Sequence, residues 1–456
     1  MENCNNKINI KKLLFLTIPI FFELILQILL GNIDKIMVRN DNTANAITQA
    51  NSILDMLIVS ISVLSAGSLI LINQYKGAKK QDKELKIYSI AFYFNILISL
   101  IIGIILLLFG KQFLILMNVN NDYINEAAIY LKLNGGFLFL QAIILSTGAF
   151  LRSNDMVLHT FIVSTLFNLL NVCLNALFLY VIKIEPIIAV GVATVISKIF
   201  GAITLLIILF KRTSIKLSIK DGLFTKKSDL KKLLKISIPS AGETLSYSLS
   251  QIVILAIINI IGYKLTSAAP TAKTYTNIMI QFSSIFTSSI SQAMQILLGR
   301  YLGAKDIKLA EKVVNLTLII SIISSIIIAT IQALFAKFIF GLFTNDINVI
   351  KLCIQIMWID VILEIGRATN IVLVRALQTN GDVLFPTLLA VFSCWVIAIT
   401  GCYLLGIVFK LGMIGIWISM TIDELFRGII FIIRFKKGKW KTKSLINQDK
   451  KELVVQ

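Results

Sequence analysis

The feature that most constrains this chain is a series of apolar stretches, each roughly 18 to 25 residues long, that recurs from one end to the other. A helix of about 20 residues is long enough to cross the hydrocarbon core of a bilayer. The fold class that the series predicts is an all-α integral membrane protein with about twelve transmembrane helices, and little chain is left for a soluble domain. The stretches lie near 13–38, 51–73, 87–109, 124–150, 157–181, 187–210, 237–262, 272–298, 312–335, 348–374, 384–409 and 412–434.

Composition supports a membrane environment and argues against a nucleic-acid partner. The chain is 57% hydrophobic and 15% charged, whereas soluble domains carry about 25% charged residues. The formal net charge is +20, but the lysines cluster between the apolar stretches rather than along one amphipathic face. The five cysteines are scattered singly and there is one histidine, so we expect neither disulfides nor a histidine-cluster metal site.

The distribution of lysine predicts how the chain is oriented. Lysines gather in the connection after the second stretch (76–86), in that after the sixth (211–235) and in the C-terminal tail, while the alternate connections carry about one positive charge each. Connections rich in Lys and Arg stay in the cytoplasm. We therefore expect a multi-pass protein of the cell (plasma) membrane, the inner membrane in a bacterium, with both termini cytoplasmic.

The two halves of the sequence resemble one another. Residues 11–23 and 231–243 each carry Lys-Lys-Leu-Leu, then Ile-Pro, then Glu, at an offset of 220 residues. Residues 75–79 (Tyr-Lys-Gly-Ala-Lys) and 301–305 (Tyr-Leu-Gly-Ala-Lys) match at an offset of 226. Two echoes at nearly equal offsets indicate an internal repeat.

The repeat predicts the domain organisation. Six stretches per half is an even number, so the halves are parallel repeats related by an axis along the membrane normal. A third, weaker match supports the repeat: Arg152 and Asp155 precede the fifth stretch as Arg375 and Asp382 precede the eleventh. We predict two pseudo-symmetric six-helix bundles: an N-terminal lobe at 1–211, a cytoplasmic linker at 212–230, a C-terminal lobe at 231–435 and a basic cytoplasmic tail at 436–456.

Acidic residues inside the apolar stretches are the first candidates for function. A carboxylate in hydrocarbon costs several kcal/mol unless it is paired or protonated. Glu364 also has a structural interpretation, since Arg367 lies three residues later on the same helical face. We interpret Asp423 and Arg427, in the last stretch, as a structural pair near water. The candidate acids are Glu23, Asp34, Glu243, Asp360 and Glu364.

Two prolines lie about one helical turn before two of these acids. Pro19 precedes Glu23, and Pro239 precedes Glu243. Proline removes a backbone donor and bends a helix, so we predict helix-bending positions at both, and a bendable helix beside an acid suits a gate. The alternative is that each glutamate pairs with a buried lysine or hydroxyl and only holds helices together.

Amide and hydroxyl oxygens in the first half complete a candidate cation site around Asp34. Asn168, Asn171 and Asn175 share one helical face by their spacing of 3 and 4, and Thr194 lies in the next stretch. Such oxygens with a carboxylate bind Na⁺, and a buried carboxylate alone binds a proton. The alternative is that the asparagines are polar contacts between helices.

The chain carries no motif for nucleotide chemistry or catalysis. It has neither a Walker A sequence nor a Rossmann glycine pattern, and no constellation for an intramembrane enzyme is visible. We predict that it is not an enzyme and needs no cofactor. Its energy should then come from a gradient of a coupling ion, Na⁺ or H⁺.

Several short motifs, in their order along the chain, resemble those of the multidrug and toxic compound extrusion (MATE) family. The resemblance covers nearly the whole chain. It rests on Ile18-Pro19 and on the segments 31–38 (Gly-Asn-Ile-Asp-Lys-Ile-Met-Val), 74–78, 168–175, 191–194, 299–304 and 381–386. It implies an exporter that exchanges amphipathic, mostly cationic compounds for sodium or protons by alternating access of two lobes.

The resemblance also implies site residues. Asp34, Asn171, Asn175 and Thr194 fall where the family has its first-lobe cation site, here a possible Na⁺ site. Glu243 and Glu364 fall where many members have second-lobe acids, and Pro19 matches the proline at which the first helix bends. The family often has Asp where this chain has Asn175, and Asn cannot exchange a proton near neutral pH.

A flippase for a lipid-linked saccharide, or for another amphipathic lipid, is the alternative function. Related transporters share the two-lobe plan, and such a flippase predicts a cavity lined with Arg and Lys. The apolar stretches show acids instead, apart from Arg367. As partners we expect small organic substrates and membrane lipids, with the protein acting as a monomer.

Overall fold

The computed structural model describes residues 10–30, 33–38, 40–117, 119–225 and 227–442. It is helical, and the described part of the chain contains no β-strand. The chain divides into two compact units: an N-terminal unit, 22–238, and a C-terminal unit made of 239–456 together with 1–21. The boundaries fall inside α1 (Ile10–Leu30) and α10 (Lys227–Lys264), the two proline-containing helices of the sequence repeat.

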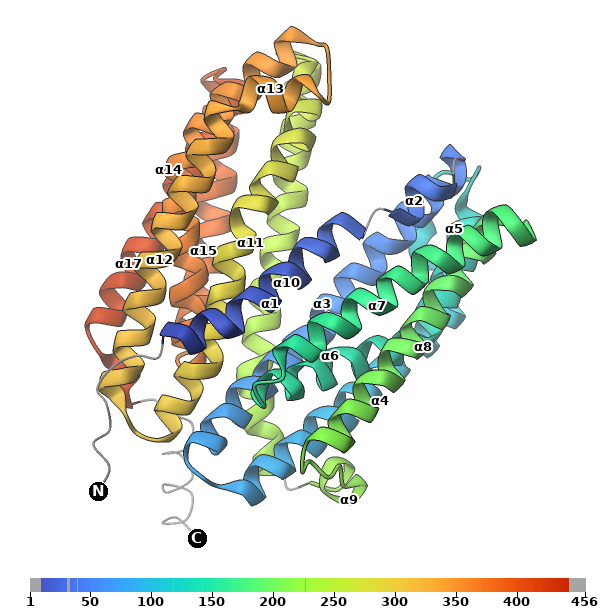
Figure 1. The fold of residues 1–456 in the computed structure, drawn as a ribbon. Helices are drawn as coiled ribbons and strands as arrows, with labels where there is room; N and C mark the ends of the chain where they lie inside the picture. The colour runs from blue at the N-terminus through green and yellow to red at the C-terminus, as the bar shows by residue number, and fades with distance from the viewer. Residues whose placement is uncertain (1–9, 31–32, 39, 118, 226, 443–456) are drawn as a thin grey trace. The chain divides into compact units, whose positions relative to one another are not determined.

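In the N-terminal unit, α4 packs against α3, α5 and α6, and α8 packs against α5, α6 and α7. Figure 1 shows these helices running alongside one another. Beyond its part of α1 and α10, the unit contains α2 (Ile33–Val38), α3 (Asp41–Gly77), α4 (Gln81–Leu116), α5 (Ile124–Gly136), α6 (Leu138–Ser153), α7 (Val157–Ala176), the π-helical η1 (Leu177–Ile182), α8 (Pro186–Arg212) and α9 (Ile219–Leu223).

In the C-terminal unit, α14 packs against α11, α12 and α17 and is the centre of the bundle. Two π-helical segments, η2 and η3, alternate with α15 and α16. Beyond its part of α1 and α10, the unit contains α11 (Ala268–Gly303), α12 (Ile307–Leu334), α13 (Ala336–Gly341), α14 (Ile347–Thr379), α15 (Leu384–Phe392), η2 (Ser393–Ile399), α16 (Thr400–Tyr403), η3 (Leu404–Val408), α17 (Gly412–Lys436) and the 3₁₀ turn η4 (Lys439–Thr442).

The burial pattern along the helices is the reverse of that in a water-soluble protein. Along α12 the large apolar side chains are exposed at every fourth position, and small or hydroxyl-bearing side chains fill the packed face. Small residues at helix contacts are typical of bundles in lipid, where backbones approach closely. The exposed residues are Ile319, Ile323, Ile327 and Ile331; the buried ones are Thr317, Ser321, Ser325 and Ala329.

The described residues of every predicted apolar stretch are almost entirely helical, and this confirms the all-α membrane fold. Among the described residues, 8 helices are long and apolar enough to cross a membrane, or up to 9 when the bent pair α5 and α6 is counted as one span. The remaining three predicted stretches lie on α11, α14 and α17, which carry more polar or charged residues. Such helices avoid lipid by packing against one another, as these do.

The stretch predicted as one helix near 124–150 is broken. α5 and α6 meet at Phe137 with a bend of 45°. The reason is a close backbone approach: a Cβ on Gly135 would lie 2.6 Å from a Leu106 side-chain carbon on α4, and one on Gly103 would lie 2.9 Å from the carbonyl oxygen of Gly135. Glycine permits this contact and also lowers the cost of the break.

The internal repeat is visible in the backbone of the turns. α3 and α11 end at the matching glycines, and the next lysines, Lys79 and Lys305, both take the left-handed conformation, with φ of 56° and 61°. In each turn the residue after that lysine donates its N–H to the tyrosine carbonyl five residues back, at 3.0 and 2.9 Å. Lys183 and Lys410, both with φ of 58°, repeat the correspondence at an offset of 227.

The third correspondence between the two halves exists, but its residues match one position earlier than the sequence suggested. The left-handed residue between α6 and α7 is Asp155, with φ of 61°, and its counterpart is Gly381, with φ of 85°, at the same offset of 226. Asp155 therefore corresponds to Gly381 rather than to Asp382. The shared charge of Asp155 and Asp382 suggested the wrong pair, because at this turn the two halves share the backbone conformation and not the residue type.

The predicted linker, 212–230, contains structure of its own. Helix α9 packs against α4, where the N–H of Ser218 donates to the Ser89 hydroxyl at 3.0 Å and Gly222 leaves room for the Tyr93 ring. The lobe and linker boundaries stay predictions. Most of the predicted basic tail lies outside the described residues, which end at 442.

The contact between α14 and α17 gives a test of this packing. A Cβ on Gly366 would lie 2.7 Å from the backbone carbon of Glu424, so Gly366→Ala forces the two helices apart. We expect a loss of about 1–3 kcal/mol of stability, seen as a lower midpoint of thermal unfolding in detergent. Gly242→Ala is the matched control, since no atom lies within 4 Å of its added Cβ. An unchanged midpoint for Gly366→Ala would contradict this packing.

Candidate functional site

The four predicted first-lobe residues lie together in the N-terminal unit. Asn175 on α7 donates from its amide nitrogen to Asp34 on α2 at 2.6 Å and to the Asn171 amide oxygen at 3.3 Å. Asn171 donates in turn to the Thr194 hydroxyl on α8 at 3.3 Å, and that hydroxyl donates to the Val190 carbonyl at 2.9 Å. The result is a polar chain across three helices that ends at a carboxylate.

One atom of these hydrogen-bonded groups has no partner among the described residues. Asn175 is wholly buried, and its amide oxygen accepts no hydrogen bond from them. Buried amide oxygens are normally satisfied, so an orphan here marks a place where a water or a cation fits. Asn168, expected on the same face, donates to the Ser164 carbonyl of its own helix at 2.8 Å. Among the described residues there is no group of three His, Cys, Asp or Glu that could hold a metal ion.

Neighbours of this site were missed by the sequence analysis. Tyr130 on α5 is buried, and its hydroxyl lies close to Thr194 on α8 and Asn51 on α3. One turn beyond those partners lie Lys198 on α8 and Asp55 on α3, and Lys198 interacts electrostatically with Asp34 and Asp55. Asp55 and Lys198 lie within predicted apolar stretches, so the rule that selected the other acids could have found them.

Glu23 has a structural partner. Its carboxylate forms an ion pair with Arg152 on α6, at 3.1 Å, in the N-terminal unit. The pair is partly buried, and each group neutralises the other inside the bundle. The structure therefore places Glu23 away from the polar chain and in a contact between helices.

In the C-terminal unit, α14 carries two buried acids one turn apart. Glu364 forms the intrahelical ion pair with Arg367 that its spacing indicated. Asp360 is wholly buried, and neither of its carboxyl oxygens accepts a hydrogen bond. The two acids interact electrostatically with each other and with Glu424 on α17.

Arg427 on α17 is the centre of a second charged cluster. It contacts Asp423 at 2.7 Å and Glu424 at 2.9 Å. Asn370 on α14 donates to the Glu424 carboxylate at 2.5 Å, and Ser393 donates to Asp423. The predicted pairing of Asp423 with Arg427 is confirmed, but its placement near water is wrong, since Asp423, Glu424 and Arg427 are only 3%, 6% and 7% exposed.

Glu243 lies on α10 near this cluster. Gln378 at the end of α14 donates to its carboxylate at 3.1 Å, and Arg427 is its main electrostatic partner. In the described part of the chain no hydrogen bond joins Glu243 to Glu364. The structure thus relates the two predicted acids through the cluster around Arg427 rather than by direct contact.

Pro19 and Pro239 lie inside continuous helices, α1 and α10. The Thr387 hydroxyl on α15 donates to the Pro239 carbonyl at 3.3 Å. A side chain thus contacts the backbone at the proline itself, whereas the carbonyl that Pro239 deprives of a donor lies four residues earlier. Bending at either proline stays a prediction.

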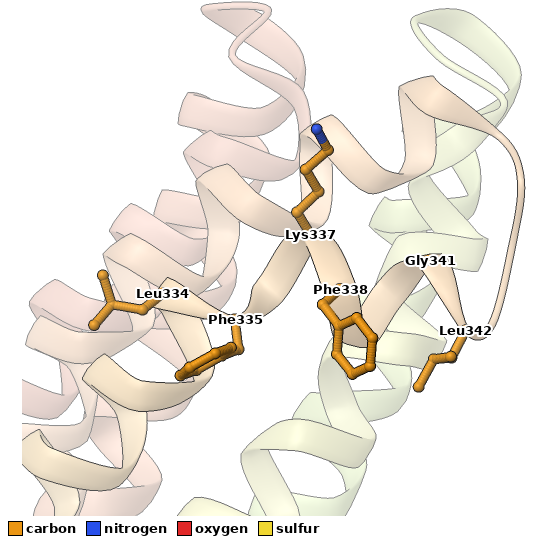
Figure 2. A pocket seen from close by; sticks show the side chains of 6 residues that line it. All are labelled: Leu334, Phe335, Lys337, Phe338, Gly341 and Leu342. Atoms are coloured by element: carbon orange, nitrogen blue, oxygen red, sulfur yellow. The ribbon is translucent and has the colours of Figure 1, made fainter.

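A hollow of 510 Å³ at the junction of α12 and α13 lacks the chemistry of a cation site. Its lining is apolar except for Lys337. Figure 2 shows the Lys337 amino group pointing to the side opposite Phe335, Phe338 and Leu342. A lysine that turns its charge away from exposed apolar side chains is typical of a helix end at a membrane surface. The lining residues are Leu334, Phe335, Lys337, Phe338, Gly341 and Leu342.

Fold and site together define a helical membrane transporter rather than an enzyme. A sequence model of the MatE family matches residues 19–177 and 239–404, once in each half of the chain. The chain belongs to the multidrug and toxic compound extrusion (MATE) family, as its motifs indicated.

Similar proteins match along the whole chain. The "Uncharacterized transporter YisQ" of Bacillus subtilis (strain 168) is 33% identical, over 94% of this chain and 95% of that protein. The "Probable multidrug resistance protein NorM" of Thermotoga maritima is 25% identical, over 97% and 96%. A crystal structure of MATE in the bent conformation has a TM-score of 0.88 at 17% identity, covering 96% of this chain and 97% of that one. That structural likeness supports the fold.

The cluster around Arg427 predicts a large effect of its removal. Arg427→Gln leaves two buried carboxylates without their cation, and we expect a loss of about 3–5 kcal/mol of stability. The control is Lys441→Gln, which breaks the exposed pair with Glu311 and should cost about 0–1 kcal/mol. Thermal unfolding in detergent compares the two, and equal midpoints would contradict the neutralising role of Arg427.

Proposed function

We propose that this protein is a secondary active exporter of amphipathic, mostly cationic organic compounds, exchanged for Na⁺ or H⁺ by alternating access of two lobes. The observation that carries the proposal is that each unit encloses carboxylates inside an apolar helix bundle, where they are costly unless they bind a cation or a proton. Family membership and the similarity to proteins named for multidrug resistance support it.

The N-terminal site has the ligand chemistry of a small monovalent cation. Asp34 supplies a carboxylate, Asn171 and Asn175 supply amide oxygens, and Thr194 supplies a hydroxyl, and hard cations favour such oxygens. The Asn175 nitrogen now donates to Asp34. A rotation of that amide would present its unsatisfied oxygen to a bound Na⁺. In a proton-driven cycle, Asp34 would be the only group of the four that exchanges a proton.

The C-terminal site is richer in acids than in bases. Among the described residues around Asp360 and Arg427, five carboxylates, of Glu243, Asp360, Glu364, Asp423 and Glu424, lie with three basic groups, of Lys273, Arg367 and Arg427. The excess of negative charge favours an organic cation. If ion and substrate compete for the same acids, each lowers the affinity for the other by the same factor, and exchange follows.

One observation favours the alternative, a flippase for a lipid-linked saccharide. Lys273, Arg367 and Arg427 lie inside the C-terminal unit, whereas only Arg367 was expected to favour this alternative from the sequence. Each of them, however, already contacts a group of its own: Lys273 the Trp417 ring, Arg367 the Glu364 carboxylate, and Arg427 two acids. These bases are engaged within the protein, so the exporter is the better-supported function.

We place the protein in the cell membrane, the inner membrane in a bacterium, with both termini cytoplasmic and with no cofactor beyond the coupling ion. The lysine-rich connections and the bacterial relatives support this placement. We propose that it acts as a monomer on small organic substrates in membrane lipid.

Reconstitution tests the proposal directly. The purified protein in liposomes should transport ethidium when a sodium or a proton gradient is applied, and the gradient that drives it names the coupling ion. Asp34→Asn, Glu243→Gln and Glu364→Gln each remove one candidate carboxylate, and the variant that loses gradient dependence identifies the coupling unit. Asp122→Asn, an exposed position, is the control and should transport normally.

Two results would overturn the exporter. Transport that is unaffected when both gradients are collapsed excludes ion coupling. Absence of ethidium transport, together with movement of a fluorescent lipid-linked saccharide across the same vesicles, favours the flippase instead.

A further inference from the structure

A buried polar group in the C-terminal unit has no satisfactory partner. Both carboxyl oxygens of Asp360 on α14 are buried and accept no hydrogen bond. The indole N–H of Trp417 on α17 lies near the carboxyl group without reaching hydrogen-bond geometry. Lys273 on α11 shares this interior and is only 7% exposed. Three neighbouring helices therefore bring one acid, one base and one indole together.

Apolar side chains make up part of the surroundings of Asp360. Cys353, Met357 and Leu363 on α14 and Met413 and Ile416 on α17 belong to one buried hydrophobic cluster that also contains Trp417. An ionised carboxylate without a hydrogen-bond donor in such a place costs several kcal/mol. A protonated carboxyl group is neutral and avoids most of that cost.

Lys273 carries the charge that would neutralise Asp360, but it contacts another group. Its amino nitrogen lies 4.7 Å from the centre of the Trp417 ring, which is a cation–π distance. No ion pair joins Lys273 to Asp360 among the described residues. Opposite charges in one dry interior attract, so an acid that leaves this lysine over an indole ring is expected to be neutral.

We propose that Asp360 is a proton-binding site and that Lys273 is its movable counter-ion. With the proton bound, Lys273 stays over the Trp417 ring. On release, the O–H bond of Asp360 breaks, the electron pair stays on the carboxylate, and the proton passes to water. The new negative charge then draws the Lys273 ammonium off the ring into an ion pair with Asp360.

Other ionisable groups face this site and set its context. Glu364 and Arg367 lie on α14 itself, Glu424 on α17 and Cys402 on α16. The ionisable residues of α12 lie within its first six positions, and α13 has one, Lys337. An ionised Asp360 adds a like charge beside Glu364 and Glu424, so the proton also changes how α11, α14 and α17 hold together.

The part of this site in transport rests on the proposed function, where it would be the proton-carrying element of the C-terminal unit. The site itself needs neither substrate nor gradient. A negative test of proton binding at Asp360 would leave ion-coupled transport standing. A negative transport assay would likewise leave proton binding at Asp360 standing.

The test follows the fluorescence of Trp417 against pH. Replacing Trp358, Trp395 and Trp440 by Phe leaves Trp417 as the sole tryptophan. Between about pH 9 and about pH 5 we expect one transition in its emission, as Lys273 moves onto the ring. Asp360→Asn, which is always neutral, should show the low-pH spectrum throughout, and Lys273→Met should abolish the transition.

Three results would overturn the proposal: no transition, a transition that persists in Asp360→Asn, or a transition that Glu364→Gln removes while Asp360→Asn does not. A second measurement keeps the four natural tryptophans, in case the triple replacement does not fold. There Asp360→Asn should match the wild-type midpoint of thermal unfolding at about pH 5 and depart from it at about pH 9. An equal difference at both pH values would contradict the site.

Discussion

The structure depends on how charged side chains are neutralised inside helices that lie in lipid. A buried charge without a partner costs several kcal/mol, so the residues around each buried charge are selected to neutralise it or to hydrogen-bond with it. Arg427 is the clearest case, because it contacts both Asp423 and Glu424 and interacts with Glu243. Helix α17, which carries Arg427 and both of these acids, packs at Gly366 against α14, which carries Asp360 and Glu364, and the two helices hold polar groups inside an otherwise apolar bundle.

The same constraint separates what the sequence could predict from what it could not. Twelve apolar stretches were sufficient for the fold class, because lipid demands long apolar helices whatever the packing, and the ordered short motifs indicated the family by resemblance. The break between α5 and α6 was missed, since it depends on Gly135 meeting α4, a contact distant in sequence. The matching of Asp155 with Gly381 was missed because a left-handed turn leaves little trace in residue type.

For the candidate site, sequence spacing and family resemblance brought Asp34, Asn171, Asn175 and Thr194 together, and the structure joins these four by hydrogen bonds. The basic partners were harder to predict. Lys198 and Lys273 lie inside apolar stretches, but only the acids of those stretches were taken as candidates. A lysine that faces an acid on another helix can be recognised only when the helices are placed side by side.

The central claim of the account is that buried carboxylates bind either a coupling ion or an organic cation. Equilibrium binding of tetraphenylphosphonium to the detergent-purified protein, measured at a series of sodium concentrations and pH values, tests it most directly. The account predicts that Kd rises as sodium or proton concentration rises, by about tenfold for each 1.4 kcal/mol of coupling, and that the cation weakens ion binding by the same factor. Binding that is tight but independent of both ions would contradict the claim.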